Sequence, residues 1–256
     1  MSGKSHGIQR TFQAIVGAPG LFNRYGKCSG CSAPEGFRRL YHLTSAEYAL
    51  SDIVFKRLKV ARFSSLNDPF ELLARAATDF GAPWDLEHQK KELDEDLGLL
   101  CFSEDWTDPV LWTHYGSRHR GICLGFDVKE GLAQKVTYRT DRISKDEIRE
   151  KTQHELLQML VYIKFESWKY EAEWRVLKKL AYLPSEGSLH FCLLDGDIRL
   201  REVILGAECT TSFLRMRELV PNFHRDVNVI QGRLAFGHLK IVPDEKTVER
   251  RAPEQA

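Results

Sequence analysis

Hydrophobic and polar residues alternate along many short stretches of the chain, and this period of two predicts β-strands. The clearest case is Gly121–Asp127, where Ile122, Leu124 and Phe126 are separated by smaller residues. Because residues two apart point to the same face of a strand, these three side chains are expected to be buried together. Similar patterns predict strands at 38–43, 58–65, 98–103, 136–139, 172–180, 189–194, 200–207, 227–234 and 238–242.

Helices are predicted where apolar residues recur every three or four positions behind a capping residue. Thr44 or Ser45 suits the N-cap of a helix over the next ten residues, and the capping box of Ser144 and Glu147 predicts a helix that runs to about Phe165. Further helices are predicted at 84–97, 108–116 and 212–219.

Many short strands mixed with few helices predict a single α+β domain with antiparallel sheets, which spans residues 37–245. Residues 1–36 are rich in Gly, Ser and basic groups without a sustained period, so a flexible N-terminal extension is expected there. Residues 246–256 form a polar C-terminal tail.

The chain has no overall electrostatic attraction to nucleic acid or to an anionic membrane, because its 37 Lys and Arg residues are nearly balanced by 36 Asp and Glu residues. A nucleic-acid partner would therefore need a local basic patch. No apolar run approaches the roughly 20 residues that cross a bilayer, and Met1–Arg10 lacks the apolar core of a signal peptide. The expected location is cytoplasmic, without a membrane partner.

Two cysteines have the spacing of metal ligands, Cys28 and Cys31 in the tract Cys-Ser-Gly-Cys. A structural zinc site normally uses a second such pair, and none follows closely in the chain. We therefore expect no metal site, and this tract is interpreted as part of the flexible extension.

The strongest candidate for chemistry is the pair Glu171 and Glu173, set two residues apart in a strand-like run between aromatic residues. On a strand the two carboxylates would share a face, and their mutual repulsion costs free energy unless the site uses it. The alternative is a solvated strand edge on which Glu173 pairs with a Lys or Arg of a neighbouring strand.

Polar and aromatic residues recur in a fixed order along the chain. The tracts are Tyr41-His42, Asn67-Asp68-Pro69-Phe70-Glu71, Cys101-Phe102-Ser103, Trp112-Thr-His114-Tyr115 and Glu171-Ala-Glu173-Trp174-Arg175. Each tract alone has an ordinary explanation as a turn or as part of the core. In this order, over residues 38–180, they resemble a bacterial family of unknown function, the DUF2971 family.

The opening strand with Tyr-His-x-Thr, the serine-bearing strand and the late Glu-x-Glu also resemble ADP-ribosyltransferases, particularly those that modify nucleic acids. This resemblance implies split antiparallel β-sheets with flanking helices and NAD, as a substrate, in the cleft. His42 would bind a ribose or phosphate of NAD, with Tyr41 and Ser64 beside it. Trp112 or Tyr115 would stack on nicotinamide, and Glu173 would bind a ribose hydroxyl.

Breaking the bond between nicotinamide and ribose develops positive charge on the sugar, which a buried carboxylate can stabilise. Glu173 is the expected stabiliser, and Glu171 the expected general base for the acceptor. Glu71 and the basic residues Arg118 and Arg120 are expected to bind the rest of the substrate, either the diphosphate or a nucleic-acid acceptor.

The hypothesis is thus an intracellular NAD-dependent ADP-ribosyltransferase-like effector, a toxin or phage-defence protein that modifies a nucleic acid or a protein. An antitoxin or another defence protein would be its partner. Two other classes fit the same residues. Asp68, Glu71, Glu171 and Glu173 could bind Mg²⁺ in a nuclease, and the aromatic residues could form the cleft of a non-enzymatic sensor or immunity protein.

Overall fold

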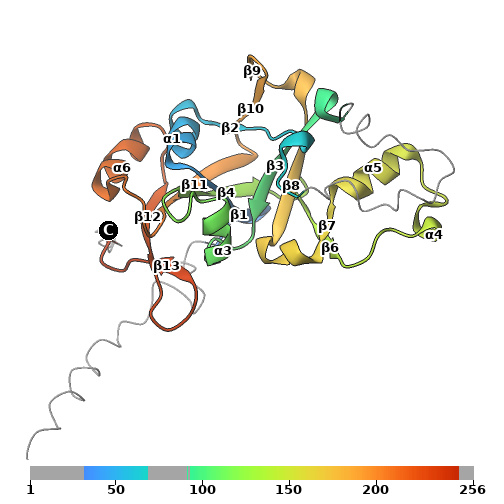
Figure 1. Cartoon of the computed structure of the whole chain (residues 1–256). Helices are drawn as coiled ribbons and strands as arrows, with labels where there is room; N and C mark the ends of the chain where they lie inside the picture. Colours follow the sequence, from blue (N-terminus) through green and yellow to red (C-terminus); the bar gives the residue numbers. More distant parts are fainter. Residues whose placement is uncertain (1–31, 69–90, 92, 248–256) are drawn as a thin grey trace, which may run out of the picture. The chain divides into compact units, whose positions relative to one another are not determined.

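A computed structural model describes residues 32–68, 91 and 93–247. The chain divides into two units, Met1–Ser32 and Ala33–Ala256, and every helix and strand described below belongs to the second unit (Figure 1). Cys28, Cys31 and Glu71 lie outside the described residues, as does most of the helix predicted at 84–97. The four cysteines within the described ranges are free thiols.

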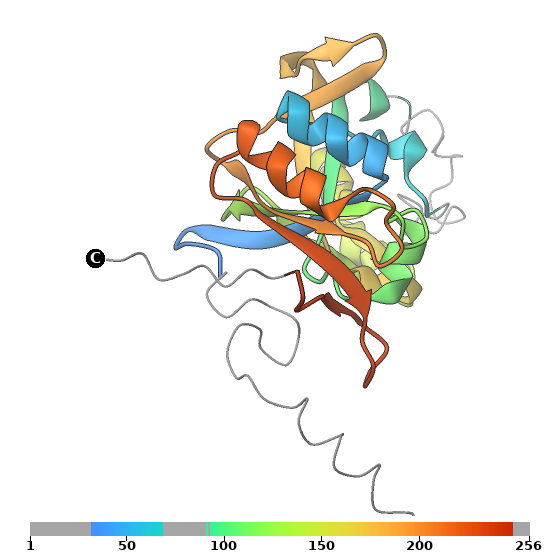
Figure 2. The same cartoon turned by 90° about the vertical axis from the view of Figure 1, so that its left-hand side faces the viewer.

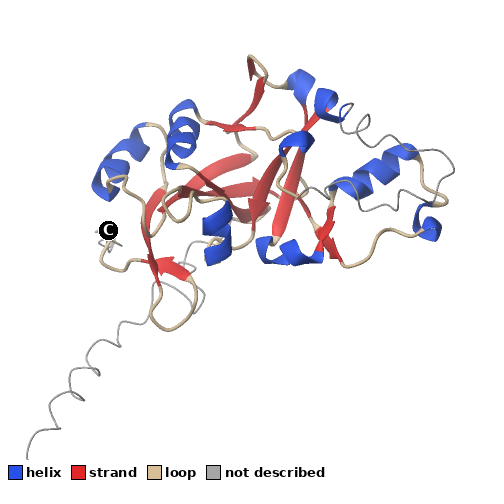
Figure 3. Cartoon of the chain, in the orientation of Figure 1, coloured by secondary structure: helices blue, strands red, loops and turns tan. Residues whose placement is uncertain are grey.

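The second unit has the predicted α+β architecture, built on one eight-stranded sheet (Figures 1 and 3). Neighbouring strands are antiparallel except β11 and β12, which are parallel. In sheet order the strands are β13 (Ile241–Pro243), β12 (Asn228–Leu234), β11 (Ile198–Leu205), β4 (Ile122–Lys129), β1 (Phe37–Thr44), β3 (Leu97–Ser103), β8 (Glu173–Lys179) and β5 (Gln134–Lys135).

Two small sheets flank the large one. The first has three antiparallel strands, β2 (Arg57–Lys59), β10 (Leu189–Leu193) and β9 (Ser185–Glu186). The second is a parallel pair, β6 (Thr137–Arg139) and β7 (Ile163–Phe165). The expectation of purely antiparallel sheets was therefore wrong for two strand pairs, because both pairs are joined by long connections that bring the chain back to the same end.

Helices cover both faces of the large sheet. α1 (Ala46–Phe55) and α6 (Phe213–Leu219) lie side by side on one face (Figure 2), and their side chains share a core with alternate residues of β4. α3 (Pro109–His114) packs on the opposite face, and α5 (Gln153–Val161) packs near β3. The remaining helical turns are α4 (Lys145–Ile148), η1 (Phe63–Ser65), η2 (Glu166–Glu171), η3 (Leu180–Tyr182) and η4 (Val220–Asn222).

Two predicted elements differ from the structure for local reasons. The predicted strand at 58–65 is short: β2 ends at Lys59 and residues 63–65 form the 3₁₀ turn η1. The predicted long helix from Ser144 is broken into α4 and α5, because Thr152 and Glu155 form a second capping box that starts a new helix. The last part of the predicted helix is the strand β7.

The large sheet is divided where β1 meets β3. β1 pairs with β4 along its whole length, but it pairs with β3 only at Tyr41 and Ser103. Beyond that point the two strands separate, and the His42 side chain reaches across the gap, with its Nδ1 3.0 Å from the carbonyl oxygen of Cys101. The gap leaves the facing edges of β1 and β3 unpaired beyond Tyr41 and Ser103.

We expect the buried Asp52 to make a large pH-dependent contribution to the stability of the fold. It lies on the core side of α1 and is 7% exposed, and burial raises its pKa from 3.8 to about 7 although Arg57 opposes the rise. A carboxyl with a raised native pKa stabilises the fold fully below pH 3.8, and this contribution is lost as the pH rises to 7. Asp52→Asn should therefore be more stable than wild type at pH 8 by up to about 4 kcal/mol, with a smaller difference at pH 5. Urea unfolding at the two pH values measures this, and an equal difference at both would contradict it.

Candidate active site

A cavity of about 230 Å³ lies where β1 and β3 separate. Residues of β1 and β3, of the segment after β2 and of α3 with the residue that follows it line the cavity, together with three charged residues, Lys164, Glu171 and Glu173. The residues that line it are Tyr41, His42, Leu43, Ala61, Ser65, Leu66, Asn67, Cys101, Phe102, Ser103, Leu111, Tyr115, Lys164, Glu171 and Glu173.

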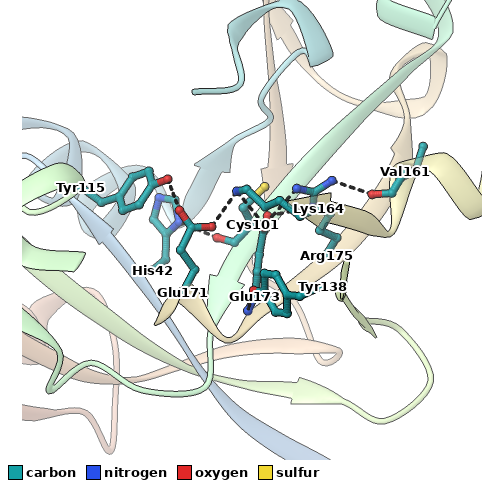
Figure 4. A network of polar contacts seen from close by, with 9 residues as sticks. All are labelled: His42, Cys101, Tyr115, Tyr138, Val161, Lys164, Glu171, Glu173 and Arg175. Carbon is teal, nitrogen blue, oxygen red and sulfur yellow. Dashed lines mark hydrogen bonds and ion pairs between the residues drawn. The ribbon is translucent and has the colours of Figure 1, made fainter. Parts of the chain in front are cut away.

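The charged end of the cavity is a buried network of two acids and two bases (Figure 4). Glu173 binds Arg175 through both oxygens, at 2.8 Å to Nε and 2.9 Å to Nη2, and Arg175 also donates to the carbonyl of Val161. Lys164 Nζ lies 2.6 Å from Glu171 Oε2 and 3.1 Å from Glu173 Oε2. The two negative charges are thus balanced by two positive charges that are equally buried.

Glu171 and Glu173 differ in their hydrogen-bond and ion-pair partners. The second oxygen of Glu171 accepts a hydrogen bond from the Tyr115 hydroxyl at 2.5 Å, so its two oxygens are held by Tyr115 and Lys164 (Figure 4). Glu173 is the partner of the fully buried Arg175. The predicted alternative paired Glu173 with a basic residue of a neighbouring strand. Lys164 of β7 is a partner from another strand, but Arg175 lies on β8 with Glu173, and the group is buried and not solvated.

Glu171 and Glu173 lie on different elements, and a backbone turn between them brings their carboxylates together. Glu171 ends the 3₁₀ helix η2, and Ala172 takes the left-handed conformation with φ 44° before β8 begins at Glu173. The expectation that both residues lie on one strand was therefore wrong. Their convergence depends on Lys164 of β7, which lies between them, and on Tyr138, whose hydroxyl accepts the Glu173 backbone N–H at 2.8 Å.

The register of the sheet aligns a row of side chains that leads to Glu173. Neighbouring strands pair Glu202 with Gly125, Gly125 with Tyr41, Tyr41 with Ser103 and Ser103 with Glu173. A Cβ on Gly125 would lie 2.8 Å from Glu202 Oε2 and 3.1 Å from the Tyr41 ring, so glycine leaves the space that these side chains occupy. Tyr41 is thereby packed into the sheet face at the wall of the cavity.

Burial and neighbouring charges shift the pKa values of the two carboxylates in opposite directions. Burial raises the pKa of Glu171, and Lys164 only partly opposes the rise. Burial acts on Glu173 in the same direction, but Arg175 and its hydrogen bonds outweigh it and hold the pKa of Glu173 at about 2. Burial together with Glu171 raises the pKa of Tyr115, which keeps its hydroxyl protonated as a donor. Glu171 is thus the more basic of the two carboxylates.

His42 lines the cavity as a neutral side chain. Burial lowers its pKa, and a carbonyl oxygen accepts the hydrogen bond at Nδ1, so Nδ1 carries the proton. Its other ring nitrogen, Nε2, is then a hydrogen-bond acceptor, and no partner for it is present among the described residues. The ring packs edge-on against Phe102, with the centroids 6.1 Å apart.

The structure brings five of the predicted site residues to one cavity, namely Tyr41, His42, Tyr115, Glu171 and Glu173. It places four others elsewhere. Trp112 is fully buried and donates from Nε1 to the carbonyl of Trp106 at 2.6 Å, so it belongs to the core. Ser64, Arg118 and Arg120 are exposed and do not line the cavity.

Sequence reasoning missed Lys164, which contacts both carboxylates. Its signal is its position between Ile163 and Phe165 in a short apolar run, because a lysine buried in such a strand requires an acidic partner. Its ammonium group also occupies the space between the two carboxylates where a cation would bind. Within residues 32–68 and 93–247, no group of three or more His, Cys, Asp or Glu side chains is arranged to hold a metal ion.

No helix in the described part of the chain is long and apolar enough to cross a membrane. No curated protein and no solved structure matches the chain. A family model described as "Protein of unknown function (DUF2971)" matches residues 111–176, a segment that runs from α3 to β8 and contains Tyr115, Lys164, Glu171 and Glu173. The match supports the resemblance of this chain to the DUF2971 family.

Proposed function

We propose that the protein cleaves the bond between nicotinamide and ribose in NAD and transfers ADP-ribose to an acceptor, with the nicotinamide end of NAD in the cavity. The observation that carries this proposal is Glu171, a carboxylate that is 4% exposed at the cavity wall and has both oxygens held. A fixed negative charge of this kind stabilises positive charge that develops on a sugar ring. The antiparallel-rich sheet with its gap between β1 and β3 supports an ADP-ribosyltransferase-like arrangement.

The proposed step is a displacement at the anomeric carbon of the ribose. The C–N bond breaks and nicotinamide leaves as a neutral molecule with the bonding electron pair. The ribose carbon bears positive charge until the acceptor oxygen or nitrogen bonds to it and loses a proton. Glu171 stabilises the positive charge and takes that proton, since its pKa is raised from the ordinary value.

This assignment moves the stabilising role from Glu173 to Glu171, which also keeps its predicted role as general base. Glu173 has both oxygens committed to Arg175 and Lys164, so its charge is already neutralised before a substrate binds. Among the described residues, the cation that contacts Glu171 is Lys164, and its other oxygen accepts from the neutral Tyr115 hydroxyl. We infer that Glu173 positions Lys164 and Arg175, whereas Glu171 acts on the substrate.

The remaining cavity residues fit the recognition of a small aromatic amide. Tyr115 presents its ring beside Glu171, and His42 Nε2 is an acceptor suited to the N–H₂ group of a carboxamide. The acceptor of ADP-ribose is proposed to be a nucleic acid or a protein, and the biological role that of a toxin or phage-defence effector with an antitoxin or defence partner.

Tyr115→Phe tests the proposal at the hydroxyl that holds Glu171. Loss of this hydrogen bond to a charged group should lower the rate of nicotinamide release about 10- to 100-fold, with a smaller change in the KM for NAD. Tyr162→Phe is the matched control, since Tyr162 is a buried tyrosine that does not line the cavity, and it should keep the wild-type rate.

Ligand-induced thermal stabilisation separates this function from the metal-dependent alternative. A ligand that binds only the folded protein raises its melting temperature, so NAD at saturating concentration should raise it and Mg²⁺ should not. Stabilisation by Mg²⁺ alone would favour a nuclease instead.

A further inference from the structure

Three aromatic side chains form a cluster beside the charged end of the cavity, which we call the aromatic platform: His114, Trp168 and Tyr170. Their ring centroids are 6.1 Å apart for Trp168 and Tyr170, 6.3 Å for His114 and Tyr170, and 6.4 Å for His114 and Trp168. His114 is exposed, and the other two are partly exposed. They come from the end of α3 and from η2.

The platform adjoins the cavity through two of its wall residues. Lys164 Nζ lies 5.1 Å from the centre of the Trp168 ring and donates to Glu171, so one side chain contacts both the platform and the catalytic carboxylate. On the other side, His114 directly precedes Tyr115, and their rings are 6.3 Å apart. The platform therefore borders the same Tyr115–Glu171 wall that faces the cavity.

The size of the cavity requires that a large substrate extend beyond it. Its volume of about 230 Å³ is below the roughly 300–1,000 Å³ of pockets that enclose drug-sized ligands. A complete dinucleotide is too large for such a space, so one end of NAD would lie in it. The diphosphate and the second nucleoside must then lie on a surface that continues from the cavity.

We propose that the aromatic platform binds the adenine base of NAD by stacking, a proposal that rests on the proposed function and assigns the second half of its substrate. Tyr170 is tilted by 31° from His114 and by 34° from Trp168, whereas His114 and Trp168 meet at 61°, so the three rings are inclined to one another. All three rings are at least partly exposed, so a ligand can reach them. A flat purine has a π-face that stacks on an accessible aromatic ring, and such stacking contributes about 1–3 kcal/mol per base.

The test is equilibrium binding to the full chain of adenosine 5′-monophosphate, ADP-ribose and nicotinamide mononucleotide, measured by calorimetry. His114→Ala, Trp168→Ala and Tyr170→Ala should each weaken adenosine monophosphate and ADP-ribose about tenfold or more, and should leave nicotinamide mononucleotide unchanged. Trp168→Phe and Tyr170→Phe keep a ring and should bind all three ligands nearly as wild type does. Because the His114 side chain is exposed, its variant should fold even if a change at Trp168 uncovers Lys164.

The results separate this inference from the proposed function. If the alanine variants bind adenosine monophosphate and ADP-ribose more weakly but bind nicotinamide mononucleotide as wild type does, the inference is supported, even for a protein that releases no nicotinamide. Equal weakening of all three ligands, unchanged binding in the alanine variants, or failure of adenosine monophosphate to bind wild type would overturn the inference, whether or not nicotinamide is released.

Discussion

Arg175→Met is expected to lower the free energy of unfolding by about 3–5 kcal/mol, because it leaves a buried carboxylate without its main partner. Arg175 is 0% exposed, and Glu173 is held by it through both oxygens. Methionine fills much of the same volume but neither neutralises Glu173 nor donates to the Val161 carbonyl. Urea unfolding monitored by circular dichroism measures the difference.

A surface ion pair provides the control for that change. Lys129 Nζ lies 3.0 Å from Asp197, a separation similar to those around Arg175, but both side chains are about half exposed. Lys129→Met should change the stability little, because solvent screens the pair. If both variants lost the same stability, burial of the Arg175 network would not be what stabilises this part of the fold.

Glu171→Gln is expected to reduce the rate of nicotinamide release from NAD by about 10²–10³-fold, the effect of removing one electrostatic group from a transition state. The amide retains the size of the side chain and one oxygen that can accept from Tyr115 or Lys164, but it lacks the charge that opposes the developing positive sugar. Rates measured at saturating NAD, with melting temperatures for both proteins, separate loss of chemistry from loss of folding.

Glu173→Gln is the matched variant, with the same chemical change two residues away. It should be less stable than Glu171→Gln, because Glu173 binds Arg175 through both oxygens and also contacts Lys164, whereas the cation that contacts Glu171 is Lys164. The fraction that stays folded should retain more activity than Glu171→Gln does. The opposite order, with a folded Glu173→Gln that is inactive and an active Glu171→Gln, would return the catalytic role to Glu173.

Local signals were sufficient to predict much of the fold. The alternation of Ile122, Leu124 and Phe126 predicted the side chains that share a core with α1 and α6, although both faces of β4 are buried. Ser45 and Asp108 cap helices at the predicted positions. In each case the determining interaction lies within a few residues of sequence, where propensity and capping act directly.

The site was less predictable because it depends on contacts between distant segments. Lys164 contacts Glu171 and Glu173 only because the chain turns through η2. That turn places Ala172 in the left-handed conformation, which is uncommon for alanine and is therefore not predicted from the sequence. The gap between β1 and β3 likewise follows from how strands far apart in sequence pair, so a sequence pattern does not reveal it. Trp112 looked like a binding residue, but its indole N–H is satisfied inside the core.

The most direct measurement of the central claim is nicotinamide release by the wild-type full chain incubated with NAD, detected by mass spectrometry with a chelator present. We expect nicotinamide to accumulate without a divalent metal and the rate of its release to fall in Glu171→Gln. A wild-type protein that neither binds nor consumes NAD, with nucleic-acid and protein acceptors supplied in turn, would contradict it.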